Sequence, residues 1–316
     1  MVRINVTSNS RTLKGISADQ FSLTSPVEGL AKYIAVSNKI SQHRIRITTL
    51  DKQTNKKRPL DLSKTYIQNG VPIGTETLEL YVKDLGPQIS WRTVFVVEYL
   101  GPLLIHPLFF TLSSIYGVKD VQHTQTQKFA YYFVLFHFIK RELETIFLHK
   151  FSNATMPAFN IFKNSSHYWI LSGFNLAYFV YGPDASSDNI AKKYLFYVND
   201  LPSIYNYALT GLFLFAELSN FTTHYILANL RSEDSKKYVI PFGYGFDLLA
   251  CPNYTFESLA WLSYALLVGN WSAWVFLFVA TGQMYLWAVK KQKRYLQTFG
   301  DEYKKLRRST YIPYVI

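Results

Sequence analysis

The sequence predicts an α-helical protein that crosses a membrane several times, preceded by a small soluble α+β domain. Residues 258–289 contain no Asp, Glu, Lys or Arg, and neither do residues 99–118 and 164–183. One helix needs ~20 predominantly apolar residues to cross a bilayer, so each stretch is long enough for at least one crossing. The first 83 residues contain no such stretch. The chain therefore divides into residues 1–83 and residues 84–316.

The composition agrees with a membrane protein. Aromatic residues make up 17% of the chain, and Trp and Tyr favour membrane interfaces, where a ring and a polar tip are both accommodated. Cys251 is the single cysteine, which excludes an internal disulfide. Residues 1–10 are polar and alternating, unlike a cleavable signal peptide, so we expect membrane insertion through an internal helix.

In residues 1–83 the pattern alternates between strand and helix signals. Residues 2–6 alternate apolar and polar side chains, as do residues 44–48 and 78–82, which predicts half-buried strands. Another strand is expected near residues 13–16. Ser25–Glu28 reads as a capping box with Pro at the first helical position, followed by one apolar helix face made of Val27, Leu30, Ala31 and Ile34. Two strands, a helix and two more strands predict a ubiquitin-like β-grasp domain, with an unrelated α+β domain as the alternative.

Residues 84–316 are read as six membrane spans. The apolar stretches end at charged or polar turns, and Gly269–Asn270 divides the long uncharged segment near the C-terminus into two. The predicted spans are residues 89–117, 129–149, 165–183, 203–230, 256–269 and 271–289.

The basic tail sets the orientation. Residues 290–308 contain eight Lys or Arg and only two acidic residues, Asp301 and Glu302. By the positive-inside rule this side is cytosolic, and six spans place both termini there. Lys192 and Lys193 fall on the opposite side, against the rule.

Charged and polar residues inside the spans are costly in lipid and are therefore functional candidates. Two predicted spans carry such residues at intervals of three or four, which places them on one helix face. The first set is His137, Lys140, Arg141 and Glu144, and the second is Glu217, Asn220, His224 and Arg231. Glu98, Asn253 and Tyr254 are expected near the same cytosolic ends. The convergence indicates a pocket open to the cytosol rather than a transmembrane pathway.

Each candidate also has an ordinary structural reading. Lys140 and Arg141 could extend to the interface, as basic side chains near helix ends do. Glu98 could form a structural ion pair, and His224 could be a hydrogen-bonded core histidine. Tyr254 could be an interfacial anchor like many of the 24 Tyr. The functional interpretation is favoured over these structural ones because the groups are expected to converge on one region.

Several chemistries are not indicated. The chain has no glycine-rich phosphate loop and no GxGxxG motif after a strand. No Cys/His cluster has metal-ligand spacing, so no metal site is expected. The HxxxH boxes of membrane desaturases are missing, and the aromatic residues lie in the spans rather than beside basic residues, so no nucleic acid is expected as a partner.

Four segments carry a resemblance to a known family: Val97–Pro102, Lys140–Thr145, Met156–Pro157 with Asn160–Asn164, and Cys251–Glu257. They resemble very-long-chain trans-2-enoyl-CoA reductases, most nearly the fungal type, within the steroid 5α-reductase superfamily. The resemblance covers nearly the whole chain, in the same order. It implies an NADPH-dependent enzyme of the endoplasmic reticulum membrane, performing the last step of fatty-acid elongation, with residues 84–316 as the catalytic domain.

The resemblance also implies roles. NADPH delivers a hydride to C3 of the enoyl thioester, and Tyr254 is the expected proton donor to C2, since a phenol with a pKa of ~10 is neutral at pH 7. Glu98, Lys140 and Arg141 match positions needed for activity. A cation could stabilise the enolate or fix a phosphate, and Glu98 could orient the donor or the nicotinamide amide. The sequence leaves these roles open.

A second group resembles the superfamily's NADPH-binding stretches. It comprises Asn220, His224, Arg231, Asn253, Lys291 and Tyr295. The steroid-reducing branch has Asp where His224 stands and Tyr where Phe138 stands. The first difference weakens the case for His224, and the second suggests that Tyr254 donates the proton and that the substrate is not a steroid.

The sequence thus predicts reduction of enoyl-CoA to saturated acyl-CoA, supplying sphingolipids and other very-long-chain lipids. The acyl tail is expected between helices in the lipid bilayer. Elongation enzymes (the condensing enzyme, ketoacyl reductase and dehydratase) are the partners implied. Two alternatives stay open: a sibling reductase acting on a steroid or polyprenol double bond, and a membrane scaffold of the elongation complex.

Overall fold

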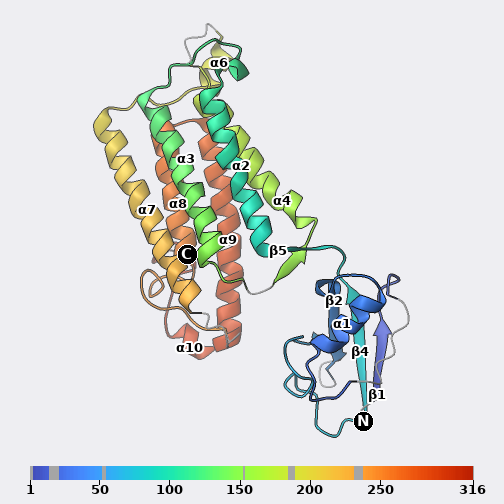
Figure 1. Ribbon diagram of the computed structural model, residues 1–316. Coiled ribbons are helices and arrows are strands. Elements are labelled where there is room, and N and C mark those ends of the chain that lie inside the picture. Colours follow the sequence, from blue (N-terminus) through green and yellow to red (C-terminus); the bar gives the residue numbers. More distant parts are fainter. Residues whose placement is uncertain are drawn as a thin grey trace. The chain divides into compact units, whose positions relative to one another are not determined.

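The computed structural model describes residues 3–13, 21–51, 55–151, 154–183, 189–230 and 238–315. The chain forms two compact units, which are considered separately (Figure 1). The first comprises residues 1–90 and 153–160, and the second comprises residues 91–152 and 161–316. The domain bounds 1–83 and 84–316 stay a prediction.

The first unit is built on a four-stranded sheet with the order β1-β4-β2-β3. The first strand, β1 (Arg3–Ser8), runs parallel to β4 (Thr77–Asp84), which also pairs with the antiparallel β2 (Ile45–Leu50). The short β3 (Lys57–Pro59) pairs with β2 and ends in a proline, which is why alternation did not reveal it. The strand expected near residues 13–16 falls mainly on residues 14–20, outside the described residues.

Helix α1 (Glu28–Ser37) covers this sheet with the apolar face that the sequence predicts. Val27, Leu30, Ala31 and Ile34 are fully buried and pack with sheet residues such as Ile47 and Leu80 in one core. A short 3₁₀ turn, Gln42–Arg44, leads from the helix into β2.

The predicted capping box was wrong. The helix begins at Glu28, its N-cap Val27 makes no side-chain cap, and the Ser25 hydroxyl instead donates to the Ser22 carbonyl at 2.7 Å. The physical reason is tertiary pairing. The backbone N–H groups of Val27 and Glu28 donate to the carbonyls of Lys64 and Leu62, so the loop satisfies groups that a cap would otherwise serve.

A partly buried ion pair ties the ends of β2 and β4 together. Arg44 donates twice to Asp84, from Nε at 3.0 Å and from Nη2 at 2.6 Å, and the hydroxyl of Thr12 adds a third bond. The Asp84 side chain is only 5% exposed. The Arg44 guanidinium lowers the pKa of Asp84 to about 2.

The short strands β5 (Gln88–Ser90) and β6 (Thr155–Pro157) pair with each other in the first unit.

The second unit is a helical bundle. Its described helices are α2 (Trp91–Thr111), α3 (Gln125–Leu143), α4 (Asn160–Ser166), α5 (Leu176–Tyr181), α6 (Ile190–Leu195), α7 (Ser203–Asn229), α8 (Pro252–Val268), α9 (Trp271–Phe299) and α10 (Asp301–Lys304). A 3₁₀ turn, Ser113–Tyr116, follows α2. α3 continues into a π-helical turn, Glu144–Leu148, and α4 continues through a π-helical stretch, His167–Asn175, into α5.

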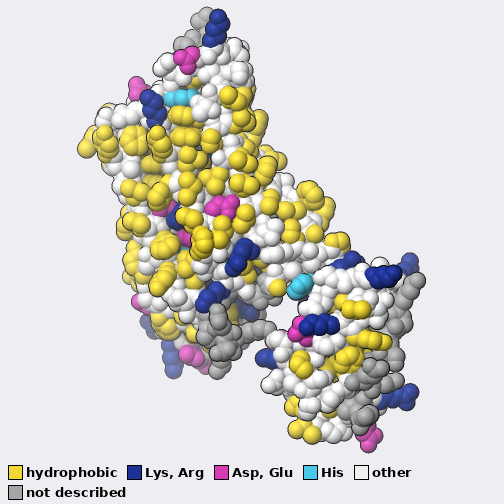
Figure 2. Space-filling model, in the orientation of Figure 1, with side chains coloured by type: hydrophobic (Ala, Val, Ile, Leu, Met, Phe, Trp, Pro, Cys, Tyr) yellow, Lys and Arg dark blue, Asp and Glu magenta, His cyan; other side chains and the backbone are white. Residues whose placement is uncertain are grey.

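Among the described residues, two helices are long and apolar enough to cross a membrane, α2 and α9. The number of crossings therefore stays a prediction. α9 extends past the predicted end of the last span at residue 289, so Lys290, Lys291 and Tyr295 lie on this helix and not in a tail. Hydrophobic side chains predominate over the face of this unit that Figure 2 shows, and many large ones are exposed, as expected where lipid is the solvent.

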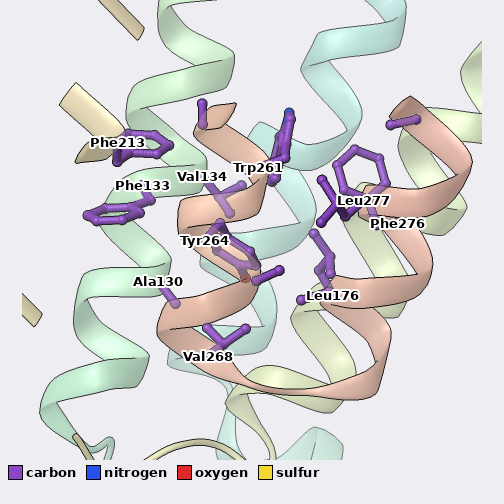
Figure 3. Packing of buried hydrophobic residues seen from close by; sticks show 14 of the residues in the cluster. Ala130, Phe133, Val134, Leu176, Phe213, Trp261, Tyr264, Val268, Phe276 and Leu277 are labelled. Carbon is purple, nitrogen blue, oxygen red and sulfur yellow. The ribbon is translucent and has the colours of Figure 1, made fainter. Parts of the chain in front are cut away.

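Helix α8 lies at the centre of the bundle and packs against α3, α7 and α9. Tyr264 on α8 is fully buried, and Trp261 contacts Phe276 of α9 edge-on at 4.5 Å (Figure 3). Phe133 of α3 stacks on Phe213 of α7 at 4.1 Å in the same core. α3 and α7 are thereby held close enough for their polar faces to meet.

A close helix contact depends on Gly101. A Cβ atom at this position would lie 2.3 Å from Cδ1 of Trp169, whose indole N–H donates to the carbonyl of Val97 at 2.8 Å. Only glycine leaves room for the indole at this point of α2.

We expect Asp84→Asn to destabilise the first unit by about 2 kcal/mol at neutral pH. The folded pKa of about 2 lies below the unfolded value, which is ~3.9. The stabilisation is therefore complete above about pH 5 and is lost as the pH falls through the folded pKa. A denaturant titration measures this loss of stability, with the protease susceptibility of residues 1–90 as the readout. Glu76→Gln, which removes an exposed carboxylate, is the control, and equal stability of both variants would contradict the pairing.

We expect Gly101→Ala to lower the melting temperature of the second unit in detergent, since overpacking costs about 1–3 kcal/mol. Gly211→Ala on α7 is the matched control, because a Cβ there meets nothing within 4 Å and alanine favours a helix by ~1 kcal/mol. Tryptophan fluorescence during thermal unfolding reports both. Identical melting of the two variants would rule out the close contact.

Candidate active site

The polar face of α3 is buried inside the bundle, as its sequence spacing predicts. His137, Arg141 and Glu144 are less than 9% exposed, and the Lys140 side chain is 12% exposed. Glu217 of α7 is also buried. Charged groups in such a place require partners, and each of these residues has them.

Arg141 is bonded on three sides. Nη2 donates to the Tyr99 hydroxyl at 2.8 Å, and Nη1 lies 2.6 Å from Oε2 of Glu144 and 3.1 Å from Nδ1 of His224. His224 in turn lies 3.0 Å from the same Glu144 oxygen. Arg141 therefore links α2, α3 and α7, and its position depends on residues from all three.

Lys140 is held by α7. Its ammonium group donates to Oδ1 of Asn220 at 2.5 Å and lies 2.7 Å from Oε2 of Glu217. Oε1 of Glu144 is 3.7 Å away. Two carboxylates neutralise Lys140 in this dry site, which explains why the lysine stays inside the bundle. Its side chain does not need to extend to the membrane interface to find a partner.

Asn220 connects this pair to the start of α8. Its amide nitrogen donates to the backbone carbonyl of Asn253 at 2.8 Å and to Oε2 of Glu257 at 3.3 Å. Asn253 is 6% exposed, and its side-chain oxygen Oδ1 has no partner among the described residues. An orphaned buried acceptor of this kind is suited to a donor on a bound molecule.

Tyr254 is half-buried beside this network. It follows Pro252, which starts the helix at a position where its missing N–H costs nothing. Within the described residues the Tyr254 hydroxyl makes no hydrogen bond. It is thus a phenol that is free to donate to a ligand.

The C-terminal segment fastens the start of α8. Residues 248–250 and Ser309 exchange two backbone hydrogen bonds at 2.9 Å. Tyr311 accepts a bond from Thr255 at its carbonyl, and its hydroxyl lies 2.5 Å from that of Ser258. Sequence reasoning missed Tyr311, because nothing local distinguishes it from the other tyrosines.

Glu98 approaches the site from α2. It is 2% exposed, its Oε1 has no hydrogen-bond partner among the described residues, and it faces Asn164 and the Arg141 guanidinium. Glu98, Lys140, Arg141, Asn220, His224, Asn253 and Tyr254 are therefore gathered around one region of the bundle, on α2, α3, α7 and α8.

Two predicted cofactor residues lie in a neighbouring cluster on α9. Tyr295 is buried between Tyr238 and Tyr303, with ring centroids 5.2 and 5.0 Å away. Lys291 lies one turn earlier, with its ammonium 6.0 Å from the Tyr295 ring. No hydrogen bond or ion pair that the structure describes joins either residue to Lys140 or Arg141. Arg231 lies outside the described residues.

Arg308 is a further candidate in this second cluster that sequence reasoning missed. It is 6% exposed, and Nη1 donates to the carbonyl of Pro241 at 2.8 Å. Nε and Nη2 have no hydrogen-bond partner in the described part of the chain. A buried guanidinium with free donors suits a phosphate. Its place in a run of basic residues made it look like one more tail charge.

Glu144, His149 and His224 have ligand atoms within 4.8 Å of one another, a spacing that could hold a metal ion. The nearby charges oppose this. Arg141 lies 2.6 Å from Glu144, so a guanidinium already neutralises the carboxylate that a metal would need. We assign these residues to the ion-pair network.

Comparisons with known proteins show the family to which the chain belongs. Residues 154–316 match the family described as 3-oxo-5-alpha-steroid 4-dehydrogenase. A protein of Schizosaccharomyces pombe described as "Putative enoyl reductase" is 45% identical over 301 residues, covering 94% of this chain and 95% of the relative. The very-long-chain enoyl-CoA reductase of Dictyostelium discoideum is 36% identical over 317 residues, covering 100% of both chains. With this similarity along its whole length, the chain belongs to the very-long-chain enoyl-CoA reductases, in the membrane-associated 3-oxo-5-alpha-steroid 4-dehydrogenase family.

Proposed function

We propose that this protein reduces the 2,3 double bond of very-long-chain trans-2-enoyl-CoA with NADPH, giving saturated acyl-CoA in the last step of fatty-acid elongation. The observation that carries the proposal is the phenol of Tyr254, which makes no hydrogen bond to the described residues, next to the buried Lys140–Asn220 pair. The relatives' names supply the reaction class. The products would feed sphingolipids and other very-long-chain lipids.

Tyr254 is the proposed proton donor. Its hydroxyl gives a proton to C2 of the substrate, and Lys140 and Arg141 stabilise the negative charge that develops on the thioester oxygen. NADPH supplies the hydride that C3 receives. Glu98, whose Oε1 has no hydrogen-bond partner in the part of the chain that the structure describes, orients the nicotinamide amide or the donor.

Several described residues have the chemistry that a bound dinucleotide needs. Oδ1 of Asn253 is a buried acceptor with no hydrogen-bond partner among the described residues, and Asn220 and His224 line the same region. Lys291 and Tyr295, with Arg308, provide cationic and aromatic groups of the kind that hold an adenosine phosphate. Arg231 completes the proposed cofactor set.

In the proposed arrangement, residues 84–316 cross the endoplasmic reticulum membrane six times with both termini in the cytosol. Residues 1–83 form a ubiquitin-like cytosolic domain, and the parallel pairing of β1 with β4 supports that fold. The acyl tail lies among the helices in the bilayer, and the charged CoA head remains in water. The other elongation enzymes are the proposed partners.

The match to a steroid-reducing family favours one second candidate, a reductase of a steroid or polyprenol double bond. Against a steroid stands Phe138, which is fully buried where the steroid-reducing branch has a tyrosine. A scaffold without chemistry is the remaining alternative, and it requires Tyr254 to be dispensable.

We expect Tyr254→Phe to lower kcat for a long-chain trans-2-enoyl-CoA about 100- to 10,000-fold, because general acid catalysis contributes about that much. NADPH oxidation by the purified protein in detergent measures it, and NADPH binding should be retained. Tyr225→Phe, at an exposed position of α7, is the control and should leave kcat unchanged. An active Tyr254→Phe enzyme would remove this residue from the chemistry.

We also expect the wild-type enzyme to prefer the thioester. Turnover per enzyme should be at least ~100-fold faster with the enoyl-CoA than with an enone steroid, since a site built for one polar group rejects its absence strongly. Parallel assays with both substrates and NADPH decide this. Faster reduction of the steroid would establish the second candidate instead.

A further inference from the structure

His137 lies on the polar face of α3, and the proposed catalytic steps do not use it. It is 2% exposed, and the rings of Phe138 and Trp261 enclose it edge-on at 4.9 and 4.8 Å. Both of its ring nitrogens nevertheless face carboxylates. Nδ1 is 2.7 Å from Oε1 of Glu217, and Nε2 is 4.0 Å from Oε1 of Glu257.

These contacts close a ring of side chains from three helices. Lys140 contacts Asn220 at 2.5 Å, and Asn220 donates to Glu257 at 3.3 Å. Glu257 faces His137, His137 bonds Glu217, and Glu217 lies 2.7 Å from Lys140. α3 contributes His137 and Lys140, α7 contributes Glu217 and Asn220, and α8 contributes Glu257. Each carboxylate uses one oxygen toward His137 and the other toward the Lys140 side of the ring.

The two ring nitrogens of His137 serve two different carboxylates. Nδ1 is within hydrogen-bond distance of Glu217, and Nε2 faces Glu257 across 4.0 Å. In a dry interior a carboxylate without a partner is costly. One imidazole therefore supports two buried carboxylates from different helices.

We propose that His137 is a positioning residue for the reduction, which holds Glu217 and Glu257 in place and through them fixes Lys140 and Asn220. The contact between Nδ1 and Glu217, called the Glu217 arm, keeps that carboxylate oriented toward the Lys140 ammonium. The contact between Nε2 and Glu257, called the Glu257 arm, orders the first turn of α8, which carries Asn253 and Tyr254. This inference rests on the proposed function, because Lys140 and Tyr254 are assigned there.

Three substitutions separate the arms. The amide nitrogen of Asn takes the place of Nδ1, so His137→Asn keeps the Glu217 arm. The amide nitrogen of Gln takes the place of Nε2, so His137→Gln keeps the Glu257 arm. His137→Phe keeps the ring shape and loses both. We expect kcat for enoyl-CoA to fall about 10-fold in each amide variant and about 100-fold in His137→Phe, since small displacements of positioned groups cost such factors. KM should change little, and His43→Gln, at an exposed site in the first unit, is the control.

The split between kcat and KM is a readout that a loss of packing alone would not give. The charged groups facing His137 are Lys140 on its own helix, Glu217 on α7 and Glu257 on α8. Each amide variant keeps one carboxylate contact, so each should retain about 10-fold more kcat than His137→Phe at an unchanged KM. Equal kcat in all three variants, or a rise in KM in place of the fall in kcat, would overturn the proposal.

Other results of these experiments would also overturn the proposed role of His137. Wild-type kcat in His137→Phe, or losses in all variants that follow their melting temperatures, would overturn it. If His137→Phe fails to fold, the two amide variants carry the test. Inactivity of the wild type with enoyl-CoA would refute the proposed function itself. NADPH affinity would then be the readout, and an unchanged dissociation constant in both amide variants would refute the ring.

Discussion

Burial of Glu144 and Glu217 inside an apolar bundle is the constraint on which the second unit depends. Neither carboxylate reaches water, so each must meet a cation or a donor. Glu144 finds Arg141, and Glu217 finds Lys140 and His137. These pairs form only when α3 and α7 lie side by side in one register. Removal of one partner would leave a buried charge, so the ion pairs specify the arrangement of the helices more than they add stability.

The pairing of these buried carboxylates also positions the residues of the candidate active site. Asn220, set by its bond to Lys140, reaches the first turn of α8 and holds the backbone of Asn253. The C-terminal segment holds that turn from the other side through Tyr311. Tyr254 is therefore presented from a rigid helix start, and no residue in the described part of the chain bonds its hydroxyl. Rigid support around one free polar group is the arrangement that catalysis by positioned donors requires.

Sequence periodicity predicted the parts of this structure that depend on local geometry. The spacing of His137 and Glu144 placed them on one face of α3, and both are buried there. Long-range contacts could not be predicted. The expected cap at Ser25 failed because backbone pairing with residues 62–64 replaced it. Tyr295 shared a sequence pattern with the site, yet it lies in an aromatic cluster on the extension of α9, while Arg308 looked like an ordinary tail charge until its burial was seen.

The most direct test of the central claim is an experimental structure of the full chain with NADPH and a non-reacting acyl-CoA analogue. The account predicts the nicotinamide and the thioester between Tyr254 and the Lys140–Asn220 pair, with a donor of the bound molecules meeting Oδ1 of Asn253. Binding of both molecules at a different face of the bundle, with the Lys140–Asn220 pair still closed and Tyr254 far from the thioester, would contradict it.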